Sequence, residues 1–182
     1  MSRSVVALIA LAVAAGASAN TPVYNANISE AEVLGAQTAW CNALVSISKT
    51  GEEKGQAAAK QLAGEVIDAA YGYNLGPVAF KPTLTVAPQT FRTTREGALA
   101  YFVGGDPNFK DDSGFALKGW TACRAENAAI LINGDVATTM GNVMITGKDG
   151  KVTTVDKTWT FKKSDDGKLR IVVHHSSLPY SP

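Results

Sequence analysis

The sequence predicts an α+β domain in which N-terminal helices pack on one face of a curved, mostly antiparallel sheet. Two observations indicate this fold class. Residues before about 105 carry helical apolar periodicity with capping residues, whereas residues from Lys118 onward alternate between apolar and polar side chains. Three turn dipeptides, Asn133-Gly134, Asp149-Gly150 and Asp166-Gly167, divide the second half into four strands. Such a sheet, curved around a helix, forms a cone whose open end can hold a pocket.

Three helices are predicted in the first half of the chain. The first begins at a capping box, Ser29-Glu30-Ala31-Glu32, and ends at Gly51. The second is alanine-rich and extends from about residue 54 to residue 70, where a segment rich in Gly and Tyr breaks the pattern. Thr93-Thr94-Arg95-Glu96 is a second capping box, and it starts a short helix that ends at Gly104-Gly105.

Five strands are predicted. A short one at 78–81 is halted by Pro82, which cannot donate a hydrogen bond to a neighbouring strand. The other four cover roughly residues 120–132, 136–146, 152–162 and 169–176. The last of them changes from apolar residues to the polar run His174-His175-Ser176-Ser177. A change of that kind indicates a strand end that opens onto a cavity or onto solvent.

The first 19 residues have the pattern of a secretory signal peptide. Arg3 is a minimal basic region, residues 5–15 are apolar, and Ala17-Ser18-Ala19 fits a cleavage site of small residues. The apolar stretch is far shorter than the roughly 20 residues that cross a bilayer. We therefore expect export to the periplasm with cleavage near Ala19. The mature protein is expected to be a single domain over 20–182 without a membrane span.

Charge excludes some classes of partner. Without Arg3, the basic residues number 16 against 16 acidic ones, so the expected mature chain has no net charge. A balanced chain without charge blocks lacks the electrostatic footprint of a nucleic-acid-binding or anionic-membrane-binding protein. We expect no nucleic acid among its partners.

Cys41 and Cys123 are the only cysteines. In an oxidising compartment, a bridge between them closes a loop of about 80 residues and contributes roughly 4 kcal/mol in the chain-entropy description. Cys41 also lies on the apolar face of the first predicted helix, where a free cysteine packs as a small apolar side chain. The sequence leaves both arrangements open.

The histidines argue against a zinc enzyme. A catalytic zinc ion generally takes three protein ligands, and this chain has two histidines, His174 and His175, which are adjacent on a strand and so point to opposite faces. A serine–histidine–acid triad is not indicated either, because Ser176 lies on the same strand as His174 and no Gly-x-Ser-x-Gly motif occurs.

Most carboxylates lie in predicted turns, but Arg124 and Glu126 are two apart within a strand and share one face. We expect them to form a structural ion pair. Glu126 is nevertheless the one plausible carboxylate base for a pocket, which keeps open an isomerase or another small-molecule enzyme.

Several segments together resemble the iota-class carbonic anhydrases, a family related to the association domain of calcium/calmodulin-dependent kinase II. The resemblance covers nearly all of the expected mature chain. The residues that carry it are Phe80-Lys81-Pro82-Thr83, the stretch from Arg95 to Gly105 that contains Tyr101-Phe102-Val103, Gly114-Phe115-Ala116-Leu117-Lys118, Glu126-Asn127-Ala128, and the terminal run from His174 to Tyr180.

The resemblance implies a nuclear-transport-factor-2-like cone, assembly into a homodimer or higher oligomer through the sheet, and reversible hydration of carbon dioxide to bicarbonate. It places the pocket hydroxyls on Thr83, Tyr101 and Ser176, with His174 beside Ser176 on the same strand face. The hypothesis is that the three hydroxyls hold water and bicarbonate and that His174 accepts or relays the proton. We expect no bound metal, although metal-assisted activity stays open. The alternative is a non-catalytic association or ligand-binding module of the same fold.

Overall fold

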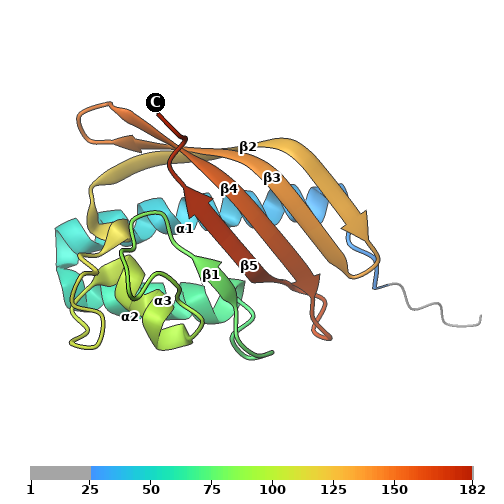
Figure 1. Cartoon of the computed structure of the whole chain (residues 1–182), viewed down its shortest axis with the longest axis horizontal. Helices are drawn as coiled ribbons and strands as arrows, with labels where there is room; N and C mark the ends of the chain where they lie inside the picture. The colour runs from blue at the N-terminus through green and yellow to red at the C-terminus, as the bar shows by residue number, and fades with distance from the viewer. Residues whose placement is uncertain (1–25, 182) are drawn as a thin grey trace, which may run out of the picture.

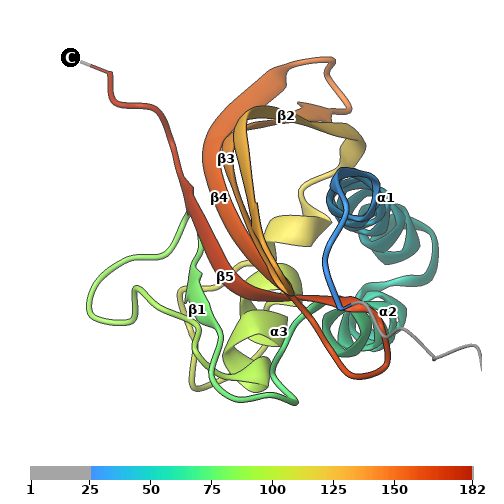
Figure 2. The same ribbon diagram turned by 90° about the vertical axis from the view of Figure 1, so that its right-hand side faces the viewer.

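The computed structural model describes residues 26–181, so the predicted export segment lies outside the described residues. Four helical elements precede most of the sheet: α1 (Glu30–Lys54), α2 (Gln56–Ala70), α3 (Arg95–Val103) and a 3-10 turn, η1 (Phe115–Leu117). The helices lie together on one side of a strongly curved sheet (Figure 1; Figure 2). No helix in the described part of the chain is long and apolar enough to cross a membrane.

The sheet has five strands in the order β1-β5-β4-β3-β2. Their bounds are Ala79–Lys81 for β1, Trp120–Asn133 for β2, Val136–Gly147 for β3, Val152–Lys163 for β4 and Leu169–Ser177 for β5. Strands β2 to β5 form an antiparallel meander, and β1 alone pairs in parallel, with β5. The predicted α+β class and the mostly antiparallel sheet are confirmed.

Two helix boundaries differ from the prediction. Helix α1 continues through Gly51 to Lys54. Gly51 serves packing instead of ending the helix, because a Cβ added there would lie 2.7 Å from Cδ2 of Leu117. The helix ends instead at Gly55, where φ is +83°. Helix α3 is capped by Thr94 rather than Thr93; its hydroxyl accepts from the Gly97 amide, so Glu96 falls one position short of closing a capping box.

Cys41 and Cys123 form a disulfide, which resolves the alternative that the sequence left open. The bridge joins α1 to β2 with a Cα–Cα distance of 5.1 Å. Next to it, the Gln37 side chain of α1 makes two reciprocal 2.8 Å hydrogen bonds with Asn127 of β2. A covalent and a polar connection therefore hold the long first helix against the same strand.

A close strand approach explains one glycine in the sheet. Strand β2 has an irregular register between Asn127 and Ala129, opposite Gly141 of β3. A Cβ added at Gly141 would lie 2.0 Å from the Glu126 carbonyl oxygen, so no other residue fits there without a backbone shift. Gly141 also pairs with Lys157 of β4, so no side chain stands beside that lysine on the β3 side.

We predict that the double variant Cys41→Ala/Cys123→Ala loses stability by up to about 4 kcal/mol, because the bridge restricts the unfolded chain over a separation of 82 residues. The measurement is urea unfolding followed by circular dichroism, with and without reductant. Reduced wild-type protein should match the double variant. Equal midpoints for oxidised and reduced wild-type protein would contradict the prediction.

Candidate active site

Two hydroxyls from distant segments meet at the edge of the sheet where β1 pairs with β5. Thr83 follows β1 by two residues, and its Oγ1 lies 2.6 Å from the Oγ of Ser176 in β5. Ser176 is buried, with 1% of its surface exposed. Lys81, at the end of β1, donates from Nζ to the Ser176 backbone carbonyl at 3.0 Å. The parallel pairing of two short strands thus brings together residues 93 positions apart in the chain.

Tyr101 of α3 faces the same place. Its ring packs between Phe80, edge-on at 5.7 Å, and Phe115, stacked at 5.4 Å. The phenol oxygen is buried and has no partner in hydrogen-bonding geometry within the described residues. Burial raises its pKa well above the usual value, and the nearby Thr83 side chain and the backbone of Thr83 and Leu84 oppose that rise in part. Tyr101 is therefore a neutral donor whose hydrogen is free for another molecule.

A small cavity adjoins Tyr101. It has a volume of about 20 Å³, close to the space of one water molecule. Its wall is partly polar and is formed by Leu84, Tyr101, Asp111, Asp112, Ser113, Phe115 and Lys118. The phenol is consequently next to a polar opening as well as to the Thr83 side chain.

A buried ion pair fixes the loop that carries Thr83. Arg92 Nε and Nη2 donate to the two carboxylate oxygens of Asp112 at 2.9 and 2.8 Å. Arg92 also donates from its backbone amide to the Phe80 carbonyl of β1, and its own carbonyl accepts from the Tyr73 hydroxyl. Since a bidentate buried pair has little freedom, the loop from β1 to α3 returns to a fixed position over the site.

His174 lies on the inner face of β5 together with Ser176, and the two-residue period predicted that these two side chains share a face. It is 2% exposed, whereas its neighbour His175 is exposed on the opposite face. The imidazole stacks on Phe80 with ring centroids 4.3 Å apart and lies edge-on to Trp40 at 5.6 Å. The two histidines therefore cannot bind one metal ion together, in agreement with the sequence argument.

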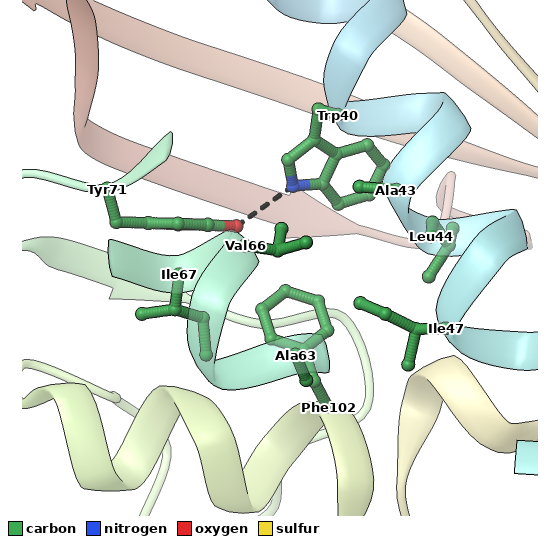
Figure 3. Close-up of a pocket in the computed structure, with 9 residues that line it drawn as sticks. All are labelled: Trp40, Ala43, Leu44, Ile47, Ala63, Val66, Ile67, Tyr71 and Phe102. Atoms are coloured by element: carbon green, nitrogen blue, oxygen red, sulfur yellow. Dashed lines mark hydrogen bonds between the residues drawn. The ribbon is translucent and has the colours of Figure 1, made fainter. Parts of the chain in front are cut away.

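Both ring nitrogens of His174 have partners. Nδ1 lies 2.8 Å from the Tyr71 hydroxyl, and Nε2 lies 2.6 Å from Lys157 Nζ. The Tyr71 oxygen also accepts from the Trp40 indole at 2.9 Å, the bond drawn in Figure 3. Burial, and secondly the charge of Lys157, hold the pKa of His174 well below its usual value. The side chain is neutral at physiological pH.

Lys157 and Tyr71 are two polar members of this region that the sequence analysis did not identify. Lys157 is 4% exposed, and burial lowers its pKa to about 7. A signal for it existed, because the inward positions of β4 are Val155, Lys157, Trp159 and Phe161, and a lysine in an alternating row of apolar residues is exceptional. Tyr71 gave no comparable signal, since it follows α2 in a segment that only marked the end of a helix.

The carboxylate alternative does not fit the site. Arg124 and Glu126 form the expected ion pair, and both side chains are about 60% exposed on β2. Glu126 is thus not a base in a pocket, and the isomerase alternative loses the one carboxylate it offered. Among the described residues, no group of three or more His, Cys, Asp or Glu side chains is arranged to hold a metal ion.

Comparison with solved structures first defines the fold. The chain aligns with a calcium/calmodulin-dependent protein kinase II association domain from Xanthomonas campestris, described as putative by its investigators, with a TM-score of 0.53 and 22% identity over 90% of this chain and 97% of the other. At that identity the likeness concerns the fold alone. It agrees with the predicted nuclear-transport-factor-2-like cone of helices on a curved sheet.

Closer similarity identifies the family. Residues 31–178 match the metal-independent carbonic anhydrase family. A metal-independent carbonic anhydrase of Nostoc sp. (strain PCC 7120) is 62% identical over 168 residues, covering 92% of this chain and 82% of the relative. The crystal structure of an iota-carbonic anhydrase from a cyanobacterium, complexed with bicarbonate, gives a TM-score of 0.88 at 63% identity, covering 90% of this chain and all of the other.

The chain therefore belongs to the metal-independent carbonic anhydrase family. The predicted enzyme class is confirmed over the alternative of a non-catalytic association module. The family assignment also supports the expectation that no metal cofactor is required.

Proposed function

We propose that this protein catalyses the reversible hydration of carbon dioxide with Thr83, Tyr101 and Ser176 as the groups that bind water and bicarbonate. The observation that carries the residue assignment is the buried Tyr101 hydroxyl, which has no hydrogen-bond partner among residues 26–181 and lies beside the Thr83–Ser176 pair. A buried donor without an acceptor costs about 1–3 kcal/mol. A bound oxyanion that accepts from this hydroxyl removes that penalty.

The three hydroxyls suit the charge that develops in the reaction. As water attacks carbon dioxide, negative charge grows on the carbon dioxide oxygens, and neutral O–H donors stabilise it. One such preorganised donor contributes a factor of about 10²–10³ in rate. A zinc enzyme lowers the pKa of its bound water to about 7. Here a positioned base has to remove the proton while the C–O bond forms.

His174 is placed in this proposal as a relay rather than as the final base. It lies two residues before Ser176 on the same face of β5, and its ring connects Tyr71 to Lys157 by hydrogen bonds. Its lowered pKa makes the imidazolium form unfavourable. A neutral imidazole can still pass a proton from one nitrogen to the other.

We predict that Tyr101→Phe and Ser176→Ala each lower kcat/KM for hydration by about 100-fold, because each removes one donor or acceptor at the bicarbonate position. Stopped-flow measurement of carbon dioxide hydration tests this. Matched controls are Tyr180→Phe, at a tyrosine that is 90% exposed, and Ser177→Ala, at the adjacent serine on the other strand face. Wild-type rates in Tyr101→Phe would overturn the site assignment.

Chelation provides the second arm of the same experiment. Hydration by wild-type protein is expected to be unchanged after incubation with a strong chelator and buffer exchange, because the proposed donors are all protein hydroxyls. A loss of activity that added zinc restores would contradict a metal-independent mechanism in this chain.

We propose further that the protein forms a homodimer through the outer face of the sheet. Support comes from Met140 of β3, which is 61% exposed on the face opposite the helices. It borders a hollow of about 460 Å³ that also contains Ala128, Asn142 and Thr158. An exposed apolar side chain beside a concave surface is a feature of protein interfaces.

Light scattering coupled to size exclusion tests the assembly. Wild-type protein is expected at twice the chain mass, and Met140→Lys at the chain mass, because a desolvated charge at the centre of an interface is costly. Leu34→Lys on the exposed side of α1 serves as the control and should stay dimeric. A monomeric wild-type protein would overturn the proposal.

We propose lastly that the chain is exported to the periplasm and cleaved after Ala19. The apolar stretch followed by Ala17-Ser18-Ala19 supports this, and so does the Cys41–Cys123 bridge, because disulfides persist in oxidising compartments. Expression of the full chain in a bacterium should give periplasmic protein. Its intact mass should match a chain that begins at Asn20. Ala19→Arg should block cleavage. Uncleaved wild-type protein in the cytoplasm would argue against export.

A further inference from the structure

Lys157 is a buried basic side chain with no carboxylate beside it among the described residues. Its side chain is 4% exposed on the inner face of β4. Nζ lies 4.9 Å from the ring centre of Trp40 and 5.2 Å from that of Trp159. Among the described residues no carboxylate pairs with it, and its one hydrogen-bond partner is His174 Nε2 at 2.6 Å. An isolated buried charge is strongly unfavourable. A lysine at this position therefore indicates a functional role.

The hydrogen bonds around His174 fit a neutral Lys157. The Trp40 indole can only donate, so the Tyr71 oxygen accepts from it. In a first arrangement the Tyr71 hydrogen points at His174 Nδ1. A neutral His174 that accepts at Nδ1 carries its proton on Nε2. That N–H then donates to Lys157 Nζ, which must offer a lone pair. In this arrangement the N–H or O–H hydrogens of Trp40, Tyr71 and His174 all have acceptors, and Lys157 is a neutral amine.

Adding one proton to Lys157 produces a second arrangement. The ammonium donates to His174 Nε2, the imidazole proton moves to Nδ1 and donates to the Tyr71 oxygen, and the Tyr71 hydrogen is left without an acceptor among the described residues. The two arrangements differ by one proton in total, held on Nζ. Burial lowers the pKa of Lys157 to about 7, which makes both of them accessible near neutral pH.

The register of the sheet puts Lys157 directly opposite Ser176 of the hydroxyl pair. Lys157 is the direct Cα partner of Ser176, and both side chains are buried on the inner face. Residues directly opposite in an antiparallel pair point to the same side, with Cβ atoms about 4.5–5.5 Å apart. Ser176 in turn contacts Thr83. A base on Lys157 is therefore beside the position where the proposed function puts the reacting water.

We propose that Lys157 is the proton acceptor of the reaction, with His174 and Tyr71 as the groups that adjust their hydrogens to its two states. This role rests on the proposed function. Water forms a C–O bond to carbon dioxide and loses one proton, and the Lys157 amine takes up that proton and becomes an ammonium. Bicarbonate carries the negative charge and Lys157 the positive one. Release of the proton to buffer restores the amine.

The other groups packed around Lys157 and His174 are less suited to accept the proton. Tyr71, which follows α2, and Tyr101 of α3 both have a pKa raised by burial, so both stay protonated. Strand β1 contributes Phe80, and Lys81 is engaged with the Ser176 carbonyl. Strand β3 contributes Gly141 opposite Lys157, and His175 faces the other side of β5.

The proposal is tested with Lys157→Met. Methionine is unbranched and similar in length to lysine, but it has no basic nitrogen. We expect a loss of about 100-fold or more in hydration, the range for removal of a general base. Wild-type kcat/KM should rise with pH through about 7, as the amine loses its proton, and this step should vanish in the variant. Lys162→Met, on the same strand and paired with Asp135 at the surface, is the matched control.

Two further measurements separate this proposal from the proposed function. Titration of Lys157 followed by nuclear magnetic resonance of labelled lysine side chains should show a transition near pH 7 in wild-type protein, absent from Lys157→Met. High concentrations of imidazole should restore part of the activity of Lys157→Ala. Normal activity and an unchanged pH profile in folded Lys157→Met would overturn the role of Lys157 while leaving the enzyme assignment intact; inactive wild-type protein would instead overturn the proposed function.

Discussion

The parallel pairing of β1 with β5 is the constraint on which the site depends. It covers three residues on β1, yet it aligns Phe80 with His174 and leads the chain through Pro82 to Thr83. The other four strands form a meander in which each strand pairs with the next one along the chain. Without β1, Ser176 would be at a sheet edge with no hydroxyl beside it, and His174 would lose the aromatic ring that covers it.

Burial determines the chemistry of each polar group along this edge. Removal from water favours the neutral form of every ionisable side chain, so Tyr101 stays a phenol, His174 an imidazole and Lys157 becomes a weak base near neutrality. Aromatic rings provide the low-polarity surroundings without providing competing charges. The proposed mechanism without metal needs donors and a base with fitting properties, and buried groups inside the cone are the candidates for both.

Much of the fold could be predicted from local sequence. Turn dipeptides and alternation gave the four long strands to within one residue at each end, and the two N-terminal helices were correct except where Gly51 serves packing rather than termination. The pairing of Cys41 with Cys123 could not be derived, because it depends on how α1 crosses β2. The hydroxyl residues came from resemblance to a family, not from spacing. Lys157 was not predicted, because the apolar residues of β4 were used only to recognise a strand. Its position in the alternating row with Val155 and Trp159 could have indicated a buried lysine.

The disulfide has a consequence beyond stability. Cys41 follows Trp40 directly on α1, so the bridge to β2 fixes the rotation of the helix that aims the Trp40 indole at Tyr71. That indole occupies one acceptor position of the Tyr71 oxygen, and Tyr71 in turn contacts His174. The bridge between α1 and β2 is therefore linked, through Trp40 and Tyr71, to an imidazole in the interior. Protein prepared under reducing conditions lacks the covalent bond that holds α1, and with it Trp40, in a fixed orientation against β2.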